Sequence, residues 1–312
     1  MSAITLNNIT KTYNKGKVLA VDDVSFSVEK GEIFGLIGPD GAGKSTVFRL
    51  LTTLLLPDKG TATVGGYDTL KDFKTIRGIL GYMPGKFSLY QDLSVEENLE
   101  FFATVFNTTI EKNYDLIKDI YVQLEPFKNR RAGKLSGGMK QKLALCCALI
   151  HKPEVLFLDE PTTGVDVVSR KEFWEMLKRY KQQGITIMVS TSYMDEATMC
   201  DRIGLMVGGK VLSIASPADT IKSFGQKLYA AKTKSMYKLL NDLRGYEGTK
   251  NCYTFGEYLH LTIKCNEEEI RKFLQEKGYT DIELMEITPT VEDCFINLLK
   301  EKDERQHSNQ NK

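Results

Sequence analysis

A lysine and a serine close a glycine-rich turn at residues 38–46 (GPDGAGKST), whose spacing fits the pattern G-x-x-x-x-G-K-[S/T]. The apolar stretch Ile33–Ile37, predicted as a buried strand, precedes the turn, and the helical stretch Ser45–Leu54 follows it. Glycines let backbone N–H groups curl around a polyphosphate, and the beginning of a helix adds partial positive charge. We therefore expect Lys44 to reach the β- and γ-phosphates of a nucleotide and Ser45 to hold Mg²⁺. The alternative, an ordinary glycine-rich turn, does not account for the strand and the helix on either side. The residues expected to bind the nucleotide in this turn are Gly38, Pro39, Asp40, Gly41, Ala42, Gly43, Lys44, Ser45 and Thr46.

Two carboxylates end a second apolar strand. Val155–Leu158 contains four apolar residues, and Asp159 and Glu160 follow directly. Carboxylates at the carboxyl end of a parallel strand face the ligand crevice of an α/β sheet. We expect Asp159 to hold Mg²⁺ through water and Glu160 to act as general base on the attacking water. Taken alone, this pair would be interpreted as surface acids that end a strand. Together with the Lys44 turn, it favours a nucleotide-binding site.

A second pair of glycines stands before another predicted helix, which runs to Ile150. The sequence LSGGMKQ at residues 135–141 places Ser136, Gly137 and Gly138 at the beginning of that helix, which is a second anion site. Since one nucleotide needs only one such site, the second indicates a second nucleotide. At this point the sequence resembles the ATP-binding cassette (ABC) ATPases. Their signature motif, to which LSGGMKQ is similar, closes over the ATP held by a partner cassette.

The resemblance covers residues 1–220 and implies the roles of further residues. Tyr13 matches the aromatic residue that stacks on adenine, with a core tyrosine as the alternative. Asp166 ends the segment PTTGVD and, by resemblance, points across a dimer of cassettes. ATP and Mg²⁺ are the implied cofactors, and the implied activity is ATP hydrolysis coupled to transport.

Within this superfamily, two segments look like the ATPase subunits of ABC-2 type exporters, which include drug exporters and tandem-cassette relatives. They are GEIFGLI at 31–37 and STSYMDEA at 190–197, and TPTVEDCFI at 288–296 resembles the carboxyl end of the same group. The implied partners are an ABC-2 type transmembrane permease and a second cassette, in a homodimer or a heterodimer. By resemblance, residues 87–93 lie where a cytoplasmic helix of the permease docks. The cargo depends on the permease, and the expected location is the cytoplasmic face of the cell membrane.

Two positions depart from the family pattern. The family usually has Gly-Tyr-x-Pro-Gln, whose Gln senses the γ-phosphate and Mg²⁺, but here Gly85 follows the proline. The family also usually has a histidine that contacts the γ-phosphate where this chain has Ser192, which can still donate a hydrogen bond. Loss of one preorganised donor typically costs about 10²–10³ in rate. We therefore expect nucleotide binding to survive, while the chain's own catalytic site is weakened. Three alternatives stay open: a homodimer that uses Glu160 at both sites, hydrolysis mainly at a partner's site, and a non-hydrolysing ATP-dependent clamp.

A soluble ABC protein acting on ribosomes or DNA is the alternative from another class. The ribosomal members usually carry two cassettes joined by a charged linker, and DNA-repair members carry a long coiled-coil insertion, but this sequence shows neither. Lys and Arg total 42 against 41 Asp and Glu, so the chain lacks the basic excess of a dedicated nucleic-acid binder. No nucleic-acid partner is expected, and membrane co-fractionation would separate the two classes.

Composition and patterning also bound the class of protein. The longest apolar run, Leu143–Ile150, has eight residues, whereas a membrane-spanning helix needs about 20. The first residues lack the basic start and apolar middle of a signal peptide, so a cytoplasmic protein is expected. The six cysteines form no C-x-x-C pair, which disfavours a zinc site or a redox pair and favours buried thiols.

Strands and helices alternate along most of the chain, which predicts the α/β class. The resemblance makes this a P-loop NTPase of the ABC type, with a mixed sheet and a helical subdomain. We expect the ATP-binding domain over residues 1–224, with the helical subdomain at about 86–150. A small α+β domain is expected over 225–300, and the apolar-free segment 301–312 is expected to be disordered.

Overall fold

The computed structural model describes residues 1–310, with side chains as far as Glu301, and it divides the chain into two compact units. Unit 1 is Met1–Pro217 and unit 2 is Ala218–Lys312, so the division falls earlier than the expected boundary after residue 224. The short helix α7 (Pro217–Lys222) explains the difference, because it packs within unit 2. There the Sγ of Cys294 lies 3.3 Å from the carbonyl oxygen of Thr220, and Phe224 packs against the same cysteine.

A six-stranded sheet forms the centre of unit 1, in the order β10-β9-β3-β8-β7-β6. Its members are β3 (Ile33–Ile37), β6 (Leu80–Met83), β7 (Val155–Asp159), β8 (Thr186–Thr191), β9 (Arg202–Val207) and β10 (Lys210–Ala215). Neighbouring strands are parallel except β10, which runs antiparallel to β9. Every residue of β3, β7 and β8 is buried, as expected for parallel strands with both faces covered. The predicted α/β class is confirmed, and so are the strands predicted before the glycine-rich turn and before the acidic pair.

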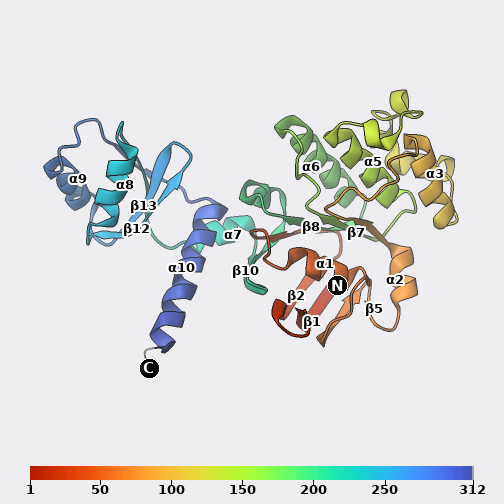
Figure 1. Ribbon diagram of the computed structural model, residues 1–312, viewed down its shortest axis with the longest axis horizontal. Helices are drawn as coiled ribbons and strands as arrows, with labels where there is room; N and C mark the ends of the chain where they lie inside the picture. Colours follow the sequence, from red (N-terminus) through yellow and green to blue (C-terminus); the bar gives the residue numbers. More distant parts are fainter. Residues whose placement is uncertain (311–312) are drawn as a thin grey trace. The chain divides into compact units, whose positions relative to one another are not determined.

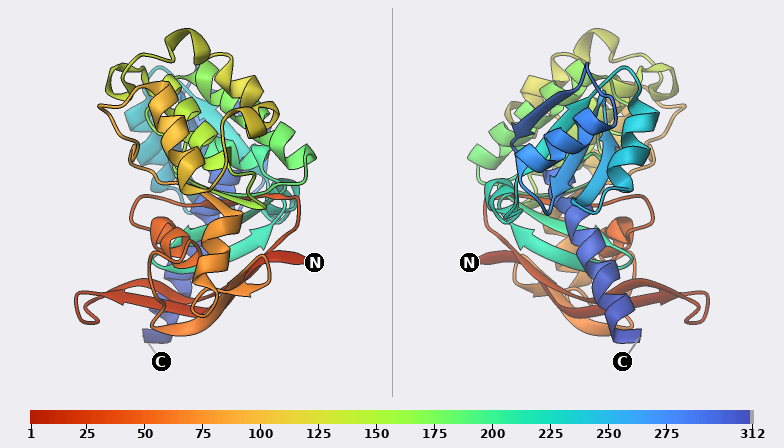
Figure 2. Two further views of the ribbon diagram at one scale, coloured as in Figure 1. Left: turned by 90° about the vertical axis from the view of Figure 1, so that its right-hand side faces the viewer. Right: turned by 90° about the vertical axis from the view of Figure 1, so that its left-hand side faces the viewer.

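A four-stranded antiparallel sheet, in the order β2-β1-β4-β5, completes the strands of unit 1. Its members are β1 (Ser2–Tyr13), β2 (Val18–Glu29), β4 (Lys59–Val64) and β5 (Tyr67–Asp68). Strands β1 and β2 pair as a long hairpin around the turn at residues 14–17 (Figure 2). The hairpin is longer than its apolar segments predict, because polar residues also take part in the strand pairing. The pairing continues past irregular backbone positions such as Asn8 and Asp23, which have positive φ.

Helices cover both faces of the six-stranded sheet. In Figure 1, β7 and β8 lie between α1 on one side and α5 and α6 on the other. The helices of unit 1 are α1 (Lys44–Leu51), α2 (Phe73–Ile79), α3 (Val95–Val105), α4 (Tyr114–Tyr121), α5 (Gly137–Leu149) and α6 (Val167–Gln182). Short 3₁₀ segments are Glu111–Asn113, Glu125–Phe127, Ala132–Lys134 and Met194–Met199. Ser94 and Glu97 cap α3 reciprocally, and the predicted helical region is realised as α3, α4 and α5. Helix α2 was not predicted, because it is short and buries only Ile76.

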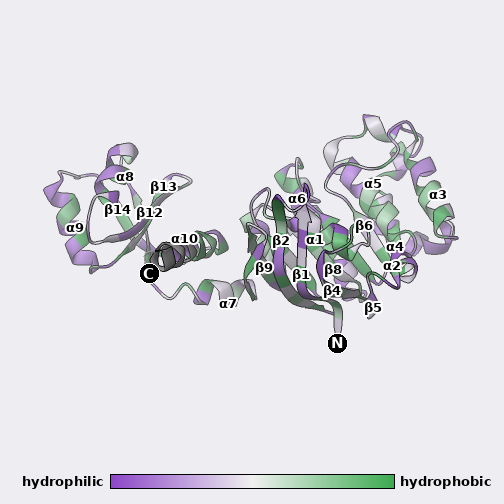
Figure 3. Cartoon of the chain, turned by 60° about the horizontal axis from the view of Figure 1, so that its bottom comes forward, coloured by the Kyte–Doolittle hydropathy of each residue, from purple (hydrophilic) through white to green (hydrophobic). Residues whose placement is uncertain are grey.

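Unit 2 is a small α+β domain with the order βαββαβ and an antiparallel sheet β12-β13-β11-β14, which is a ferredoxin-like arrangement. Its elements are β11 (Leu228–Lys232), α8 (Met236–Arg244), β12 (Thr249–Phe255), β13 (Tyr258–Ile263), α9 (Glu267–Glu276) and β14 (Glu283–Ile287). Apolar residues of α8 and α9 pack with Leu259 and Leu261 of β13. Helix α9 buries Ile270 and Leu274 in this core, and it also carries hydrophilic residues (Figure 3).

The last helix, α10 (Val291–Gln310), runs into the segment 301–312 that we expected to be disordered. The structure describes residues 301–310 as helical, and residues 311–312 lie outside the described part. This segment contains neither proline nor glycine, so its sequence holds no signal that would end the preceding helix. Over the described residues, no helix combines the length and apolar character needed to cross a membrane.

Candidate functional site

The glycine-rich turn leaves β3 at Ile37 and enters α1 at Lys44, so it lies at the carboxyl edge of the parallel strands. Two of its glycines cannot be replaced without a clash. A Cβ at Gly38 would fall 2.1 Å from the carbonyl oxygen of Met206. Gly43 has a φ of +107°, and its Cβ would fall 2.3 Å from the carbonyl oxygen of Ala20. The turn is therefore held tightly against its neighbours, with the amino end of α1 behind it.

Lys44 is 4% exposed, and its charge faces the acidic strand end. Its Nζ donates hydrogen bonds to the carbonyl oxygens of Gly38 at 2.6 Å and Pro39 at 3.1 Å. The same Nζ lies 3.0 Å from Oε1 of Glu160. The lysine of the turn and the predicted general base are thus direct neighbours, although they are far apart in sequence.

Asp159, the last residue of β7, is 4% exposed and accepts hydrogen bonds from two hydroxyl groups. Its Oδ1 lies 3.0 Å from the Oγ of Ser45 and 2.6 Å from the Oγ of Ser190. A carboxylate and a serine hydroxyl are hard oxygen donors of the kind that Mg²⁺ takes together with substrate phosphates. Among the described residues no cluster of three or more acidic, histidine or cysteine ligands occurs, so no all-protein metal cage competes with this pair.

Glu160 adopts a left-handed backbone conformation, with a φ of +51°, which is uncommon for a residue with a side chain. Its N–H donates to the carbonyl oxygen of Ser190 at 3.1 Å and to the Oγ of the same serine at 3.0 Å. Its Oε2 accepts from the Oγ1 of Thr163 at 3.2 Å and from the N–H of Ser192 at 3.3 Å. The Oγ of Ser192 lies 3.5 Å from the same oxygen. Both carboxylate oxygens therefore have fixed partners, which orients the group.

These residues surround one cavity of about 460 Å³. The cavity is lined by Asp40, Ser45, Arg49, Tyr82, Pro84, Gly85, Lys86, Asp159, Glu160, Thr163, Ser192 and Tyr193. The structure thus brings the glycine-rich turn, the acidic strand end and both departures from the family pattern to one place. A Cβ at Gly85 would lie 3.1 Å from the carbonyl oxygen of Asp159 and 3.5 Å from the Cβ of Glu160. A side chain at position 85 would therefore begin directly beside the acidic pair.

Several lining residues escaped the sequence analysis. Arg49 follows Ser45 by four residues on α1, and this spacing on one helix face could have revealed it. Lys86 directly follows Gly85 and Tyr82 precedes it by three residues, while Thr163 and Tyr193 lie within the segments PTTGVD and STSYMDEA. Burial raises the pKa of Tyr82 to about 12, so its phenol stays protonated at neutral pH.

Tyr13 ends β1, and its hydroxyl lies 3.4 Å from the Oγ1 of Thr46, at the beginning of α1. It is part-buried and does not line the cavity with the acidic pair. The predicted adenine contact thus lies next to the turn, on the side of the N-terminal hairpin.

The predicted signature residues form a separate group. Ser136 caps α5 by accepting a hydrogen bond from the N–H of Met139 at 3.4 Å. A Cβ at Gly137 would lie 3.3 Å from the carbonyl oxygen of Gly164, so this segment adjoins the beginning of α6. Asp166 caps α6, and the hydrogen bond from the N–H of Ser169 helps to lower the pKa of its carboxyl. None of these residues lines the cavity around Glu160.

Residues 21–163 match the family model described as ABC transporter. The chain is 35% identical to Nod factor export ATP-binding protein I of Rhizobium sp. (strain N33), over 95% of this chain and 96% of the relative. It is 37% identical to Linearmycin resistance ATP-binding protein LnrL of Bacillus subtilis (strain 168), over 93% of this chain and 96% of that protein. The chain belongs to the ABC transporter family as one of its ATP-binding cassettes.

A third relative of this cassette is longer. Probable multidrug ABC transporter ATP-binding protein YbhF of Escherichia coli (strain K12) is 39% identical over 304 residues, 96% of this chain, which spans only 52% of YbhF. Among solved structures, an ATP-binding subunit of an ABC transporter aligns with a TM-score of 0.65 at 27% identity, covering 72% of this chain and 94% of that one. The ATP-binding cassette MJ0796, solved as a dimer in a post-hydrolysis state with ADP and Pi, aligns with a TM-score of 0.62 at 26% identity, covering 68% of this chain and 98% of that one.

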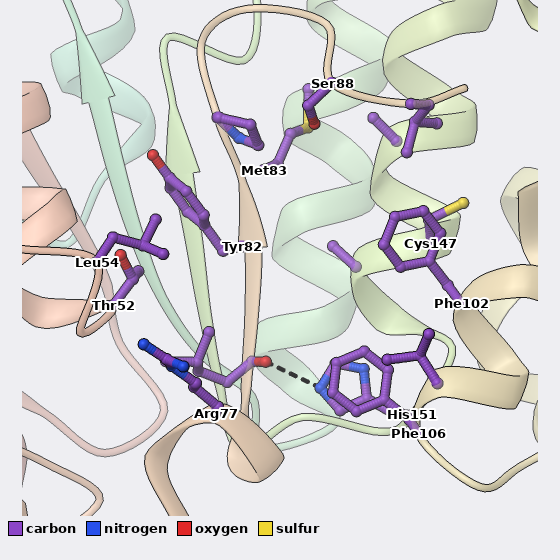
Figure 4. Close-up of a pocket in the computed structure, with 16 residues that line it drawn as sticks. Thr52, Leu54, Arg77, Tyr82, Met83, Ser88, Phe102, Phe106, Cys147 and His151 are labelled. Carbon is purple, nitrogen blue, oxygen red and sulfur yellow. Dashed lines mark hydrogen bonds between the residues drawn. The ribbon is translucent and has the colours of Figure 1, made fainter. Parts of the chain in front are cut away.

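The cassette has a second, largely apolar cavity of about 500 Å³ (Figure 4). We call it the apolar groove; its lining includes Leu54, Met83, Leu89, Phe102 and Val105. Tyr82 and Pro84 line both cavities, so the end of β6 separates the groove from the acidic pair.

A histidine forms part of the wall of the apolar groove. The ring of His151 stacks on Phe106 with centroids 3.8 Å apart, and its Nε2 lies 2.9 Å from the carbonyl oxygen of Leu80 (Figure 4). Its Nδ1 is buried and finds no hydrogen-bond partner among the described residues. Burial lowers the pKa of His151, which favours the neutral ring at neutral pH.

Proposed function

We propose that this cassette binds ATP with Mg²⁺ and hydrolyses it in the cavity formed by the glycine-rich turn and the acidic strand end. Ser45, Asp159 and Glu160 line one cavity, and the Nζ of Lys44 lies 3.0 Å from the Oε1 of Glu160; this arrangement carries the proposal. Mg²⁺, held by Ser45 and Asp159, would neutralise phosphate charge. Lys44 contacts the phosphates, and Glu160 accepts the proton of the attacking water. Thr163 and Ser192 keep the carboxylate of Glu160 oriented for that transfer.

The second group of residues supports a composite site. Ser136, Gly137, Gly138 and Asp166 adjoin one another but lie outside the cavity. We assign them to the nucleotide held by a second cassette, in a head-to-tail homodimer or heterodimer, as the family resemblance implies. Tyr13, beside Thr46, is assigned to the adenine of the chain's own nucleotide.

The partner that the cassette drives is a membrane permease of the ABC-2 type. The names of the relatives, which refer to multidrug transport, Nod factor export and linearmycin resistance, support an exporter. The apolar groove offers a surface for a cytoplasmic segment of the permease, and Ser88 and Leu89, within the segment expected to dock it, line that groove. In this proposal the cassette is cytoplasmic and peripheral to the membrane, and it contacts no nucleic acid.

The test is steady-state phosphate release by the full chain with Mg²⁺ and ATP, beside a Lys44→Ala variant and a reaction without Mg²⁺. We expect turnover that requires both the lysine and the metal ion. Turnover that persists in Lys44→Ala would place hydrolysis elsewhere, for example in a contaminating ATPase, and would contradict the proposed site.

Gly85 and Ser192 favour one second candidate, a non-hydrolysing ATP-dependent clamp. Both stand in the cavity wall where the family usually has side chains that contact the γ-phosphate. A clamp binds Mg²⁺ and ATP tightly without releasing phosphate, even when its membrane partner is present. Equilibrium binding measured beside phosphate release, with and without the permease in nanodiscs, separates the two candidates.

A further inference from the structure

A buried carboxylate behind the cavity depends on one arginine. Glu196 is 2% exposed, and its Oε1 accepts a hydrogen bond from the Oγ1 of Thr162 at 2.6 Å. Its Oε2 is buried without a hydrogen-bond partner in the described part of the chain. Among the described residues, the cation within ion-pair distance of this carboxylate is Arg170, whose Nε lies 3.6 Å from Oε1. Since a buried charge without a counter-charge is costly, Glu196 holds Arg170 in place.

The guanidinium of Arg170 lies on an aromatic ring of the cavity wall. Its Cζ is 4.1 Å from the centroid of the Tyr193 ring, and its Nη1 is 3.7 Å from Oδ2 of Asp195. The side chain of Arg170 is only 19% exposed. A planar guanidinium against an aromatic face is a directional contact that an ammonium group reproduces poorly.

Tyr193 in turn belongs to the segment that orients Glu160. Its N–H donates to the Oγ1 of Thr191, at the end of β8, at 3.0 Å. The preceding residue, Ser192, is the one whose N–H and Oγ face Oε2 of Glu160. Contacts therefore run without a break from Arg170 on α6, through Tyr193 and Ser192, to the carboxylate of Glu160.

We propose that Arg170 is a positioning residue for ATP hydrolysis. Pinned by Glu196, it fixes Tyr193 and thereby the hydrogen bonds that Ser192 gives to Glu160. The inference rests on the proposed hydrolysis at Glu160 and adds a residue that contacts neither the glycine-rich turn nor the acidic pair. Small displacements of a catalytic group can cost about 10²-fold in rate, so the arginine acts on rate rather than on nucleotide affinity.

The test compares Arg170→Met with Arg170→Lys and with a matched control, Arg179→Met. Arg179 lies on the same helix, is exposed, and pairs with Asp119 at 2.9 Å; neither residue lines the cavity. Single-turnover hydrolysis gives the rate, and equilibrium binding of a non-hydrolysable ATP analogue with Mg²⁺ gives the affinity. We expect Arg170→Met to lose about 10–100-fold in rate while its affinity changes less than about threefold. Arg170→Lys should be intermediate, and Arg179→Met should match the wild type.

Tyr193→Ala keeps the Arg170–Glu196 pair and provides a second variant where Arg170→Met folds poorly. It should lose rate similarly, and the double variant should lose little more, because both changes interrupt one chain of contacts. Additive losses, or an Arg170→Met rate within twofold of the wild type after correction for folded protein, would overturn the proposal.

Hydrogen–deuterium exchange separates failure of this inference from failure of the proposed function. In Arg170→Met the amides of Ser192 and Tyr193 should exchange faster, whereas Arg179→Met should leave them unchanged. If the wild type hydrolyses no ATP, the proposed function fails, and the exchange data still decide whether Arg170 positions this segment. Unchanged exchange in Arg170→Met would contradict the positioning role whatever the hydrolysis rate.

Discussion

Two buried aspartates, one in each unit, have opposite surroundings. Asp159 at the end of β7 is 4% exposed, and the structure gives its Oδ1 two hydroxyl partners, Ser45 and Ser190. Asp293 in the first turn of α10 is 0% exposed, and both of its oxygens are engaged. Its Oδ1 lies 2.7 Å from the hydroxyl of Tyr253 and 2.6 Å from Nδ1 of His260. Its Oδ2 accepts from the N–H and the hydroxyl of Thr290, each at 2.7 Å.

The difference lies in where each hydrogen-bond network ends. The contacts of Asp159 reach a cavity that also contains Ser45 and Glu160, so a ligand can enter the network. The contacts of Asp293 end on side chains of unit 2, and they join α10 to β12 and β13. A network that opens into a cavity, as at Asp159, leaves room for a ligand, whereas the closed network of Asp293 anchors a helix.

Among changes that bear on the contrast between the two aspartates, Asp159→Asn has the largest expected effect. The amide keeps the size of the side chain and can still hydrogen-bond, so stability should change little. The loss of the carboxylate beside Ser45 should lower the hydrolysis rate by about 10²–10³-fold, because charge developing on the phosphates is no longer balanced. Single-turnover phosphate release measures this effect. A variant that hydrolyses ATP at the rate of the wild type would contradict a role of Asp159 in hydrolysis.

The double variant Gly85→Gln/Ser192→His tests the same cavity by adding side chains to its wall. It restores the two side chains that the family usually places against the γ-phosphate, and each such donor is worth about 10²-fold in rate. We expect faster hydrolysis that still requires Glu160. A Cβ at position 85 would lie 3.1 Å from the carbonyl oxygen of Asp159, so this carbonyl must shift by a few tenths of an ångström to accommodate the glutamine. The control is the same double variant carrying Glu160→Gln. If the double variant gains nothing, the two departures have no bearing on the rate.

Asp293→Asn should affect stability and leave chemistry alone. The amide nitrogen must face a hydrogen-bond donor of the closed network, so the unfolding free energy of unit 2 should fall by about 1–3 kcal/mol. The single tryptophan, Trp174, is buried in unit 1, so its fluorescence during urea unfolding reports unit 1 alone. Hydrogen exchange of α10 and β13 reports unit 2. A loss of hydrolysis in folded Asp293→Asn protein would show that the network of unit 2 is not confined to anchoring.

Acid should weaken unit 2 through the same residue, with the smallest expected effect. Burial raises the pKa of Asp293, but the hydrogen bonds from His260, Thr290 and Tyr253 outweigh it and lower the pKa to about 2. Because the folded pKa lies below the unfolded value, this stabilisation is present above about pH 4 and is lost as the pH falls toward 2. After correction for the intrinsic exchange rate at each pH, the protection of α10 amides should therefore fall more between pH 5 and pH 2.5 in the wild type than in Asp293→Asn. Equal acid sensitivity would assign the effect to other groups.

The sequence predicts the parts of the site in which chemistry is local. The turn before α1 and the acids at the end of β7 each combine a strand, a loop and reactive side chains within about ten residues. The parallel pairing of β3 with β8, and of β8 with β7, then brings these loops together at one edge of the sheet. The α/β class and the place of Asp159 and Glu160 follow from these patterns.

Contacts between distant segments could not be predicted in the same way. Ser190 meets Asp159 because β8 pairs beside β7, and Arg170 of α6 meets the ring of Tyr193; nothing in their own segments indicates either contact. The fold of unit 2 also rests on pairings between distant strands, and α2 has too few buried residues for an apolar period.

The central claim is that Glu160, oriented inside this cavity, hydrolyses ATP. The most direct test is single-turnover phosphate release by the full chain beside its Glu160→Gln variant, with nucleotide binding measured on both proteins. The account predicts that the wild type releases phosphate and that the variant does not. The variant should bind a non-hydrolysable ATP analogue at least as tightly, because Lys44 loses the carboxylate that lies 3.0 Å from its Nζ. Equal phosphate release by both proteins, or loss of nucleotide binding in the variant, would contradict the account.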